Sequence, residues 1–262
     1  MGNILDVKNL NIEYDVRSGF LGCNIKKNLA VKKVSFDLKE GEVLGIIGES
    51  GSGKSSLIKA IAGINKVKSG DIIYNEKYYI SKFKGKEEWK PIRSDIQMIF
   101  QNPSASLDPN MTIYDIIAEP LLYSGKKYSK KQIDEEVDIM MRNVCLHSSF
   151  KTKYSDQCSG GQNQRVAIAR ALIQKPKILL CDEPVSALDV STQAHIMNLL
   201  KDMKDKFDLT IIFISHDLNV VHYIADNIFV MYKGEIIERD KCSEIYRNPK
   251  HDYTKMLVNS LL

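Results

Sequence analysis

A glycine-rich segment between an apolar run and a helix-like run constrains this sequence most. Residues 48–56 read Gly-Glu-Ser-Gly-Ser-Gly-Lys-Ser-Ser, directly after the apolar run Val43–Ile47 and at the start of the helical pattern Ser55–Ala62. Glycine adopts backbone angles closed to other residues, so successive amide N–H groups can converge on phosphate oxygens next to a helix N-terminus. A strand, a glycine loop and a helix in this order predict a nucleotide-binding P-loop.

The residue types within this loop predict a division of labour. Lys54 is expected to reach the β- and γ-phosphates, Ser55 to place its hydroxyl on Mg²⁺, and Ser56 to reach an α-phosphate oxygen. The other residues predicted to contact the nucleotide are Gly48, Glu49, Ser50, Gly51, Ser52 and Gly53.

Composition bounds the class of protein. The chain has 262 residues and is 44% hydrophobic, enough for a sizeable core in one domain with subdomains or in two small domains. Its charge of +4 is mild, and its basic clusters are interleaved with other residues, which favours solvated loops over a nucleic-acid track. Five scattered cysteines without a C-x-x-C pair indicate a reducing compartment and argue against a structural metal site. With no long apolar stretch and no signal-like start, we expect a chain that neither spans a membrane by itself nor is secreted.

The order of the predicted elements indicates an α/β fold. The early strands are close together, as in an antiparallel sheet, whereas the later half alternates strand and helix, as in a parallel sheet with crossovers. Residues 103–158 read as mostly helix and loop, which suggests a helical insertion in an α/β nucleotide-binding core. The predicted strands are Leu5–Tyr14, Val31–Leu38, Val43–Ile47, Asp71–Tyr74, Ile96–Phe100, Ile178–Cys181, Thr210–Ile214, Asn227–Tyr232 and Glu235–Glu238. The predicted helices are Ser55–Ala62, Ile113–Tyr123, Lys130–Val144, Gly160–Gln174, Ser191–Phe207 and Leu218–Ala225.

Two adjacent carboxylates follow the apolar strand Ile178–Cys181. Ligands of parallel α/β sheets gather at the carboxyl ends of strands, where Asp182 and Glu183 fall. Asp182 is expected to hold Mg²⁺ directly or through water, and Glu183 to orient and polarise the water that attacks the γ-phosphate. An acidic turn after a buried strand is common by itself, but the P-loop upstream favours the functional interpretation.

The segment Ser159-Gly160-Gly161-Gln162 opens a predicted amphipathic helix. Ser159 and Gln162 have the spacing of a capping box. Glycine at the first two helical positions costs stability but bares backbone N–H groups to an anion. The P-loop already supplies one phosphate site, so we expect this second site to act on a nucleotide held by another subunit.

Together these motifs resemble the ATPase subunit of an ATP-binding-cassette (ABC) transporter, over nearly the whole chain and in family order. The resemblance implies that two cassettes dimerise head to tail, with each ATP between one P-loop and the partner's Ser-Gly-Gly-Gln. It implies that Gln101 contacts Mg²⁺ and the attacking water and that Asp189 lies in the loop linking the two ATP sites. It further implies that His216 contacts the γ-phosphate and holds Glu183 in register.

The resemblance also implies a domain organisation and an aromatic residue that stacks on adenine. Residues 1–262 would form a single ABC ATPase domain, with a nucleotide-binding core at 1–102 and 159–240, a helical subdomain at 103–158 and a short tail at 241–262. Tyr14 lies about where the family carries the stacking aromatic, and Phe20 is the alternative.

Finer features resemble the peptide and nickel importer branch, and its second ATPase in particular. These features are the segments Arg17–Val31, Gln97–Pro109 and Asn248–Thr254. The branch implies a heterodimer of two cassettes, with a homodimer as the alternative, on the cytoplasmic face of the membrane with two permease chains and an extracytoplasmic binding protein. Oligopeptides, dipeptides, nickel and metallophores stay open as cargo. The alternative function is a soluble cassette ATPase acting on nucleic acid or ribosomes, and 262 residues hold neither the long coiled coil nor the second cassette of such relatives.

Overall fold

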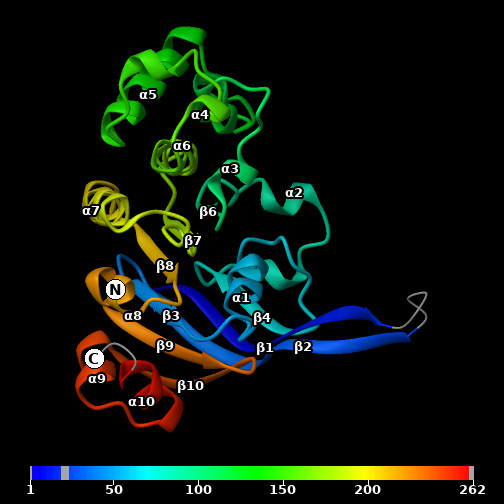
Figure 1. Cartoon of the computed structure of the whole chain (residues 1–262). Coiled ribbons are helices and arrows are strands. Elements are labelled where there is room, and N and C mark those ends of the chain that lie inside the picture. The colour runs from blue at the N-terminus through cyan, green and yellow to red at the C-terminus, as the bar shows by residue number, and fades with distance from the viewer. Residues whose placement is uncertain (1, 19–23, 260–262) are drawn as a thin grey trace. The chain divides into compact units, whose positions relative to one another are not determined.

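The computed structural model describes residues 2–18 and 24–259, which form two compact units (Figure 1). The first unit comprises residues 1–88 and 212–262, and the second comprises residues 89–211. Phe20, the alternative to Tyr14, lies outside the described residues.

The first unit contains a four-stranded antiparallel sheet in the order β2-β1-β4-β5. Its longest strands, β1 and β2, pair at the blue end of the colour bar in Figure 1. The strands are β1 (Asn3–Ser18), β2 (Asn24–Lys39), β4 (Ser69–Tyr74) and β5 (Tyr78–Tyr79).

A matched pair of irregularities keeps the apolar side chains of β1 and β2 on one face. Val7 and Leu10 are both buried although three positions apart, and Asn9 between them has a positive φ of 47°. Val31 and Val34 in β2 repeat this spacing around Lys33, whose φ is 46°. The register shifts between Val7 and Leu10, so an extra residue restores the alternation that a regular strand would lose.

The first unit also contains strands that flank the P-loop. Strand β3 is buried along its whole length and pairs in parallel with β9, which pairs antiparallel with β10. A Cβ at Gly45 of β3 would lie 2.2 Å from Val221 Cγ1 of α8, so glycine is needed for this helix to pack on the strand. The elements are β3 (Val43–Ile47), α1 (Lys54–Ile61), the 3₁₀ helix η1 (Ile80–Lys82), α2 (Lys86–Trp89), α8 (Leu218–Ile224), β9 (Asn227–Tyr232), β10 (Glu235–Lys241), α9 (Cys242–Arg247) and α10 (Asp252–Asn259). The boundaries between the units fall within α2 and within β8 (Thr210–Ile214).

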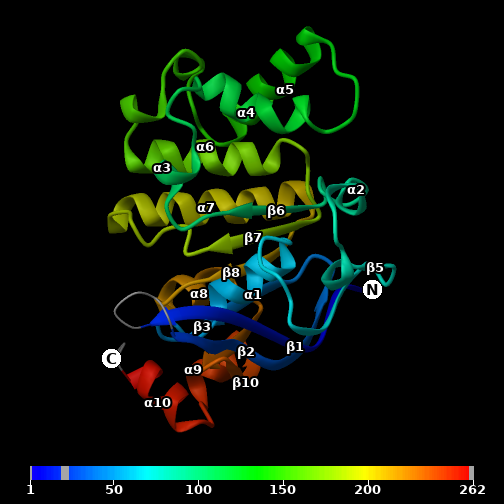
Figure 2. The same ribbon diagram turned by 90° about the vertical axis from the view of Figure 1, so that its right-hand side faces the viewer.

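The second unit packs helices around α6 and a parallel strand pair, β6 and β7. Helix α6 lies between α4 and α7 (Figure 2) and buries most of its length, which fits its run of small and branched apolar residues. Side-chain capping boxes begin α4, α5 and α6. The elements are β6 (Ile96–Ile99), α3 (Pro103–Ser106), α4 (Ile113–Leu122), α5 (Lys130–Asn143), η2 (Ser148–Phe150), η3 (Ser155–Gln157), α6 (Gly160–Leu172), β7 (Ile178–Asp182) and α7 (Val190–Phe207).

The prediction of an α/β fold with an early antiparallel sheet is confirmed, and every predicted strand and helix range overlaps an element of that type. The predicted subdivision at residues 102, 158 and 240 stays a prediction, and the compact units divide within α2 and β8 instead. No helix among the described residues is long and apolar enough to cross a membrane.

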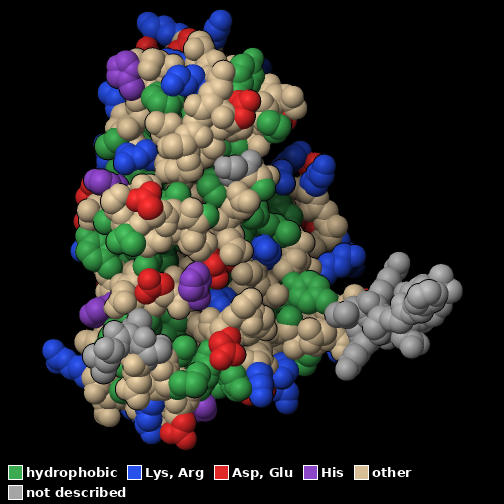
Figure 3. All heavy atoms as spheres, in the orientation of Figure 1, with side chains coloured by type: hydrophobic (Ala, Val, Ile, Leu, Met, Phe, Trp, Pro, Cys, Tyr) green, Lys and Arg blue, Asp and Glu red, His purple; other side chains and the backbone are tan. Residues whose placement is uncertain are grey.

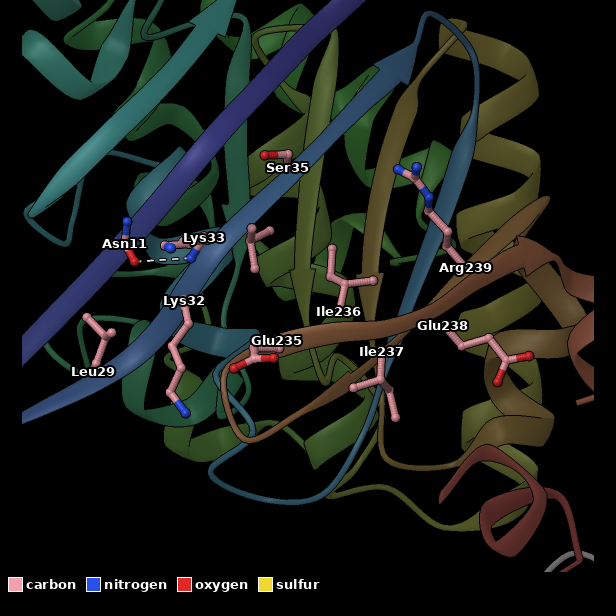
Figure 4. A pocket seen from close by; sticks show the side chains of 11 residues that line it. Asn11, Leu29, Lys32, Lys33, Ser35, Glu235, Ile236, Ile237, Glu238 and Arg239 are labelled. Atoms are coloured by element: carbon pink, nitrogen blue, oxygen red, sulfur yellow. Dashed lines mark hydrogen bonds between the residues drawn. The ribbon is translucent and has the colours of Figure 1, made fainter. Parts of the chain in front are cut away.

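An open groove of about 780 Å³ lies in the first unit, between β2 and β10 with Asn11 of β1 at its side (Figure 4). In the wall of the groove, the backbone N–H of Lys33 in β2 donates to Asn11 Oδ1 of β1 at 3.1 Å and connects the two strands. The lining carries both cations and carboxylates, among them Arg239 and Glu238. None of the predicted nucleotide-site residues lines this groove.

Candidate nucleotide and hydrolysis site

The P-loop follows β3 and ends at the N-terminus of α1, as predicted. Three of its glycines have positive φ: Gly48 (150°), Gly51 (81°) and Gly53 (103°). A Cβ at Gly48 would lie 2.1 Å from the Met231 carbonyl oxygen, and one at Gly53 would lie 2.3 Å from the Ala30 carbonyl oxygen. Two of the glycines are therefore needed for close approach of backbones, whereas Gly51 faces open space.

Lys54 is buried at 5% exposure, and its ammonium group turns back over the loop. Nζ donates to the Gly48 carbonyl at 2.6 Å and to the Glu49 carbonyl at 2.9 Å. The Ser52 hydroxyl is buried and has no hydrogen-bond partner among the described residues. A cationic group, an unpartnered hydroxyl and the positive end of the α1 dipole converge here, so this loop fits an anion such as a phosphate.

Strand β7 ends at Asp182, which is 1% exposed, and Glu183 follows at once. In the same unit, Gln101 Nε2 donates to Glu183 Oε2 at 3.0 Å. The structure thus brings together two predicted hydrolysis residues that are 82 positions apart. Sequence order placed each after a strand, and the parallel pairing of β6 with β7 puts both strand ends on one edge.

The backbone of Glu183 is strained. Its φ is 47°, in the left-handed region, where a residue with a Cβ typically costs about 1–3 kcal/mol. The Ser186 amide and hydroxyl both donate to the Glu183 carbonyl, at 3.3 Å and 3.2 Å, and help to hold this conformation. Asn9 and Lys33 share this φ outside the site, so the hydrolytic role of Glu183 is supported by its contact with Gln101 and not by its backbone angle.

The predicted capping box at the start of α6 is confirmed. The Ser159 hydroxyl accepts from the Gln162 amide at 3.3 Å, and Gln162 Oε1 accepts from the Ser159 amide at 2.9 Å. Ser159 and Gly160 are exposed, and Gly161 is half-buried. Burial raises the pKa of the preceding Cys158 thiol, which donates to the Tyr154 carbonyl, so this cysteine packs as a neutral group.

The two glycines of α6 lie against the start of α7. A Cβ at Gly161 would lie 2.6 Å from Thr192 Cγ2, and one at Gly160 would lie 3.4 Å from Leu188 Cδ2. Besides baring N–H groups, Gly161 therefore makes room for Thr192.

Asp189 fixes the position of Thr192. Asp189 is the N-cap of α7. Its carboxylate accepts hydrogen bonds from the Ser191 hydroxyl at 2.6 Å, the Thr192 hydroxyl at 2.7 Å and the Thr192 amide at 3.0 Å. The hydrogen bond from Ser191 is the largest cause that lowers the pKa of Asp189, and the hydrogen bonds from Thr192 lower this pKa further. The ionised carboxylate therefore fixes the start of α7, against which the segment Ser159–Gln162, called the signature below, is packed.

The remaining predicted residues lie in the first unit. His216 is exposed and lies two residues after the end of β8, and the next residue, Asp217, is the N-cap of α8. Tyr14 is half-buried in β1, and its hydroxyl accepts from Asn65 Nδ2 at 2.6 Å.

The site residues are divided between the two units. Tyr14, the P-loop and His216 belong to the first unit. Gln101, the signature Ser159–Gln162, Asp182, Glu183 and Asp189 belong to the second unit. Among the contacts within a unit are those of Lys54 with the loop, Gln101 with Glu183, and Asp189 with Thr192.

Sequence reasoning missed one residue at the P-loop. The hydroxyl of Tyr253, on α10, accepts from the Glu49 amide at 2.9 Å. The only signal was the resemblance of Asn248–Thr254 to the importer branch, which marked the segment without giving it a role.

Comparisons with known proteins agree with this fold and give its family. A family model described as ABC transporter matches residues 31–186. The chain therefore belongs to the ABC transporter family.

Among curated proteins, the chain is 44% identical to the oligopeptide transport ATP-binding protein OppF of Salmonella typhimurium, over 98% of this chain and 77% of that protein. It is 42% identical to the oligopeptide transport ATP-binding protein AppF of Bacillus subtilis, over 98% of this chain and 78% of that protein. It is also 42% identical to the dipeptide transport ATP-binding protein DppF of Lactococcus lactis subsp. cremoris, over 98% and 81%.

Solved structures of cassettes share the fold. The ATP-binding cassette MJ0796, in a dimeric post-hydrolysis state bound to ADP and Pi, superposes with a TM-score of 0.80 at 31% identity, covering 91% of this chain and 98% of that one. The cbiO1 protein of Clostridium perfringens, part of the ABC transporter complex cbiONQ, gives a TM-score of 0.79 at 31% identity, covering 95% and 92%.

Proposed function

We propose that this chain is the ATP-hydrolysing motor subunit of an ABC importer that takes up peptides through membrane permease subunits. The contact of Gln101 with Glu183 at the carboxyl ends of β6 and β7 supports the catalytic part of the proposal. The peptide cargo is supported by the names of relatives that are 42–44% identical over nearly the whole chain.

The P-loop would bind the phosphates of ATP. Lys54, held over the loop by the Gly48 and Glu49 carbonyls, would reach the β- and γ-phosphates, and Ser56 would reach the α-phosphate. Tyr14 would stack on adenine, since its ring is only half-buried and its hydroxyl is anchored by Asn65.

The oxygen donors of the site suit Mg²⁺. Hydroxyl, amide and carboxylate oxygens are the ligands this hard cation prefers, and Ser55, Gln101 and Asp182 offer one of each kind. Bound there, Mg²⁺ would neutralise charge on the β- and γ-phosphates.

Hydrolysis would depend on Glu183. Its carboxylate would accept a hydrogen bond from the attacking water and take up a proton from it, with Gln101 orienting the carboxylate. His216 would contact the γ-phosphate and hold Glu183 in register.

The signature Ser159–Gln162 would complete the ATP site of a partner cassette, and Asp189 would link the two sites of the dimer. The anchoring of Thr192 by Asp189 and its fit against Gly161 support this link, because a displacement of one loop is passed to the other. We propose a second, different cassette as partner, with a homodimer as the alternative.

We propose that the chain forms a single ATPase domain at the cytoplasmic face of the membrane, in which the helical segment 103–158 transmits closure of the dimer to two permease chains. An extracytoplasmic binding protein would supply the cargo. Closure driven by ATP and reopening after hydrolysis would act as a two-state switch.

A soluble cassette acting on nucleic acid is disfavoured, because the relatives that are 42–44% identical are named as transport proteins. On the face drawn in Figure 3, Lys and Arg side chains are interspersed with Asp and Glu, whereas a nucleic-acid track needs cations gathered in a stripe.

The test is an affinity purification of the Glu183→Gln variant from its native membranes in mild detergent with ATP, followed by mass spectrometry of every co-purifying chain. Two polytopic permeases, a second cassette and a binding protein are expected. Peptides bound to that binding protein would identify the cargo. Bound nickel or a bound metallophore would instead assign the chain to a metal importer. Ribosomal or DNA-bound partners without a membrane protein would contradict the importer function.

A further inference from the structure

The C-terminal segment is tied into the first unit by a buried carboxylate. Glu238 of β10 is 8% exposed and accepts from the amides of Lys250 and His251 at 2.8 Å and 2.9 Å. The Tyr253 amide then donates to His251 Nδ1 at 3.1 Å. These bonds set where α10 begins and leave its first turn against β9 and the P-loop.

Tyr253 reaches the P-loop from this turn. Its side chain is 8% exposed and its ring centroid lies 4.5 Å from that of Tyr232 at the end of β9. The hydroxyl oxygen accepts from the Glu49 amide at 2.9 Å. Burial raises the pKa of Tyr253, so the hydroxyl stays neutral at physiological pH.

One rigid peptide group connects Tyr253 with Lys54. The Gly48 carbonyl and the Glu49 N–H belong to the same planar unit and point to opposite sides of it. The carbonyl accepts from Lys54 Nζ at 2.6 Å, while the N–H donates to Tyr253. A rotation of this plane therefore moves the oxygen that holds Lys54, and the Tyr253 hydroxyl resists that rotation.

We propose that Tyr253 is a positioning residue for the nucleotide site, and that ATP binding at the P-loop and the order of the C-terminal helix α10 are coupled through its hydroxyl. The coupling is reciprocal, since a contact that changes ATP affinity must respond to ATP by the same factor. The inference rests on the proposed nucleotide site and adds a residue 204 positions from Glu49.

The test is equilibrium ATP binding to the full chain carrying Tyr253→Phe, which removes the hydroxyl and keeps the ring. A lost hydrogen bond of this kind corresponds to a loss of about twofold to tenfold in affinity. Tyr246→Phe is the matched control, because Tyr246 of α9 is also partly buried and its hydroxyl donates to a backbone carbonyl outside the P-loop, that of Leu218. We expect the control to bind ATP like the wild type.

Hydrogen exchange of the α10 amides supplies a readout that a merely structural role would not change. Saturating ATP should slow exchange over residues 252–259 in the wild type and in Tyr246→Phe, and should leave it unchanged in Tyr253→Phe. If Tyr253→Phe does not fold, the effect of ATP on hydrogen exchange of the α10 amides in the wild type remains as the test of the coupling.

Three results would overturn the inference: unchanged ATP affinity in Tyr253→Phe, an equal loss in both variants, or no response of α10 to ATP in the wild type. A wild-type chain that binds no ATP would instead overturn the P-loop assignment itself, and this inference with it.

Discussion

Replacing Gly53 with alanine tests whether the P-loop requires glycine for space as well as for conformation. Gly53 has a φ of 103°, and its added Cβ would lie 2.3 Å from the Ala30 carbonyl oxygen, where ordinary contact begins at 3.4 Å. The left-handed backbone alone costs about 1–2 kcal/mol for a residue with a Cβ. Displacing β2 or the loop by the missing distance adds about 1–3 kcal/mol, as overpacking does.

Gly51→Ala is the matched control within the same loop. Gly51 also has a positive φ, 81°, but nothing lies within 4 Å of its added Cβ. It should therefore show only the conformational cost of about 1–2 kcal/mol. The entropy that alanine removes from the unfolded chain applies to both variants and cancels between them.

The assay is urea unfolding of the nucleotide-free chain, followed by circular dichroism. We expect Gly53→Ala to be less stable than Gly51→Ala by about 1–3 kcal/mol, with an earlier midpoint and a similar slope. Equal stability of the two variants would refute the reasoning, because the approach of the Ala30 carbonyl would then carry no cost.

Three further changes test the roles of individual side chains. Lys54→Ala should weaken ATP binding or its productive engagement, since the cation at the loop is lost; unchanged affinity and hydrolysis would remove the P-loop assignment. Glu183→Gln should keep ATP binding and lose nearly all steady-state turnover, because an amide cannot take a proton from water; normal hydrolysis by an assembled complex would exclude this role. The lowered pKa of Asp189 stabilises the fold above the ordinary carboxyl pKa of about 4, and this contribution is lost as the pH falls below it. Asp189→Asn should therefore be less stable than the wild type at neutral pH but lose less on acidification, and parallel pH–stability curves would contradict the carboxylate cap.

Most of the fold could be predicted from the sequence, whereas the roles of the site residues stay predictions. Apolar patterns in the sequence predicted the longer strands and helices, because each of these elements buries one face or its whole length. Strands β3 and β7 are buried along their whole length. The β1–β2 pair extends beyond the predicted Leu5–Tyr14 and Val31–Leu38 because paired backbones continue past the last buried side chain, for example where Asp15 lies opposite Lys27.

The features that could not be predicted from the sequence depend on backbone geometry, on short elements and on contacts between distant positions. The positive φ of Glu183 has no sequence signal, since glutamate is not a residue that favours this region. Helices α9 and α10 are short and flank Pro249, so they show too few turns for a periodic pattern. The contact of Tyr253 with Glu49 joins positions 204 residues apart and is visible only in the folded chain.

The most direct measurement of the central claim is peptide uptake by the complete transporter reconstituted in proteoliposomes, with ATP on the side of this chain and the binding protein on the other. The account predicts that peptide accumulates at the expense of ATP, and that Glu183→Gln in this chain abolishes accumulation while the assembled complex still binds ATP. Uptake that proceeds without ATP, or undiminished uptake by the variant complex, would contradict the account.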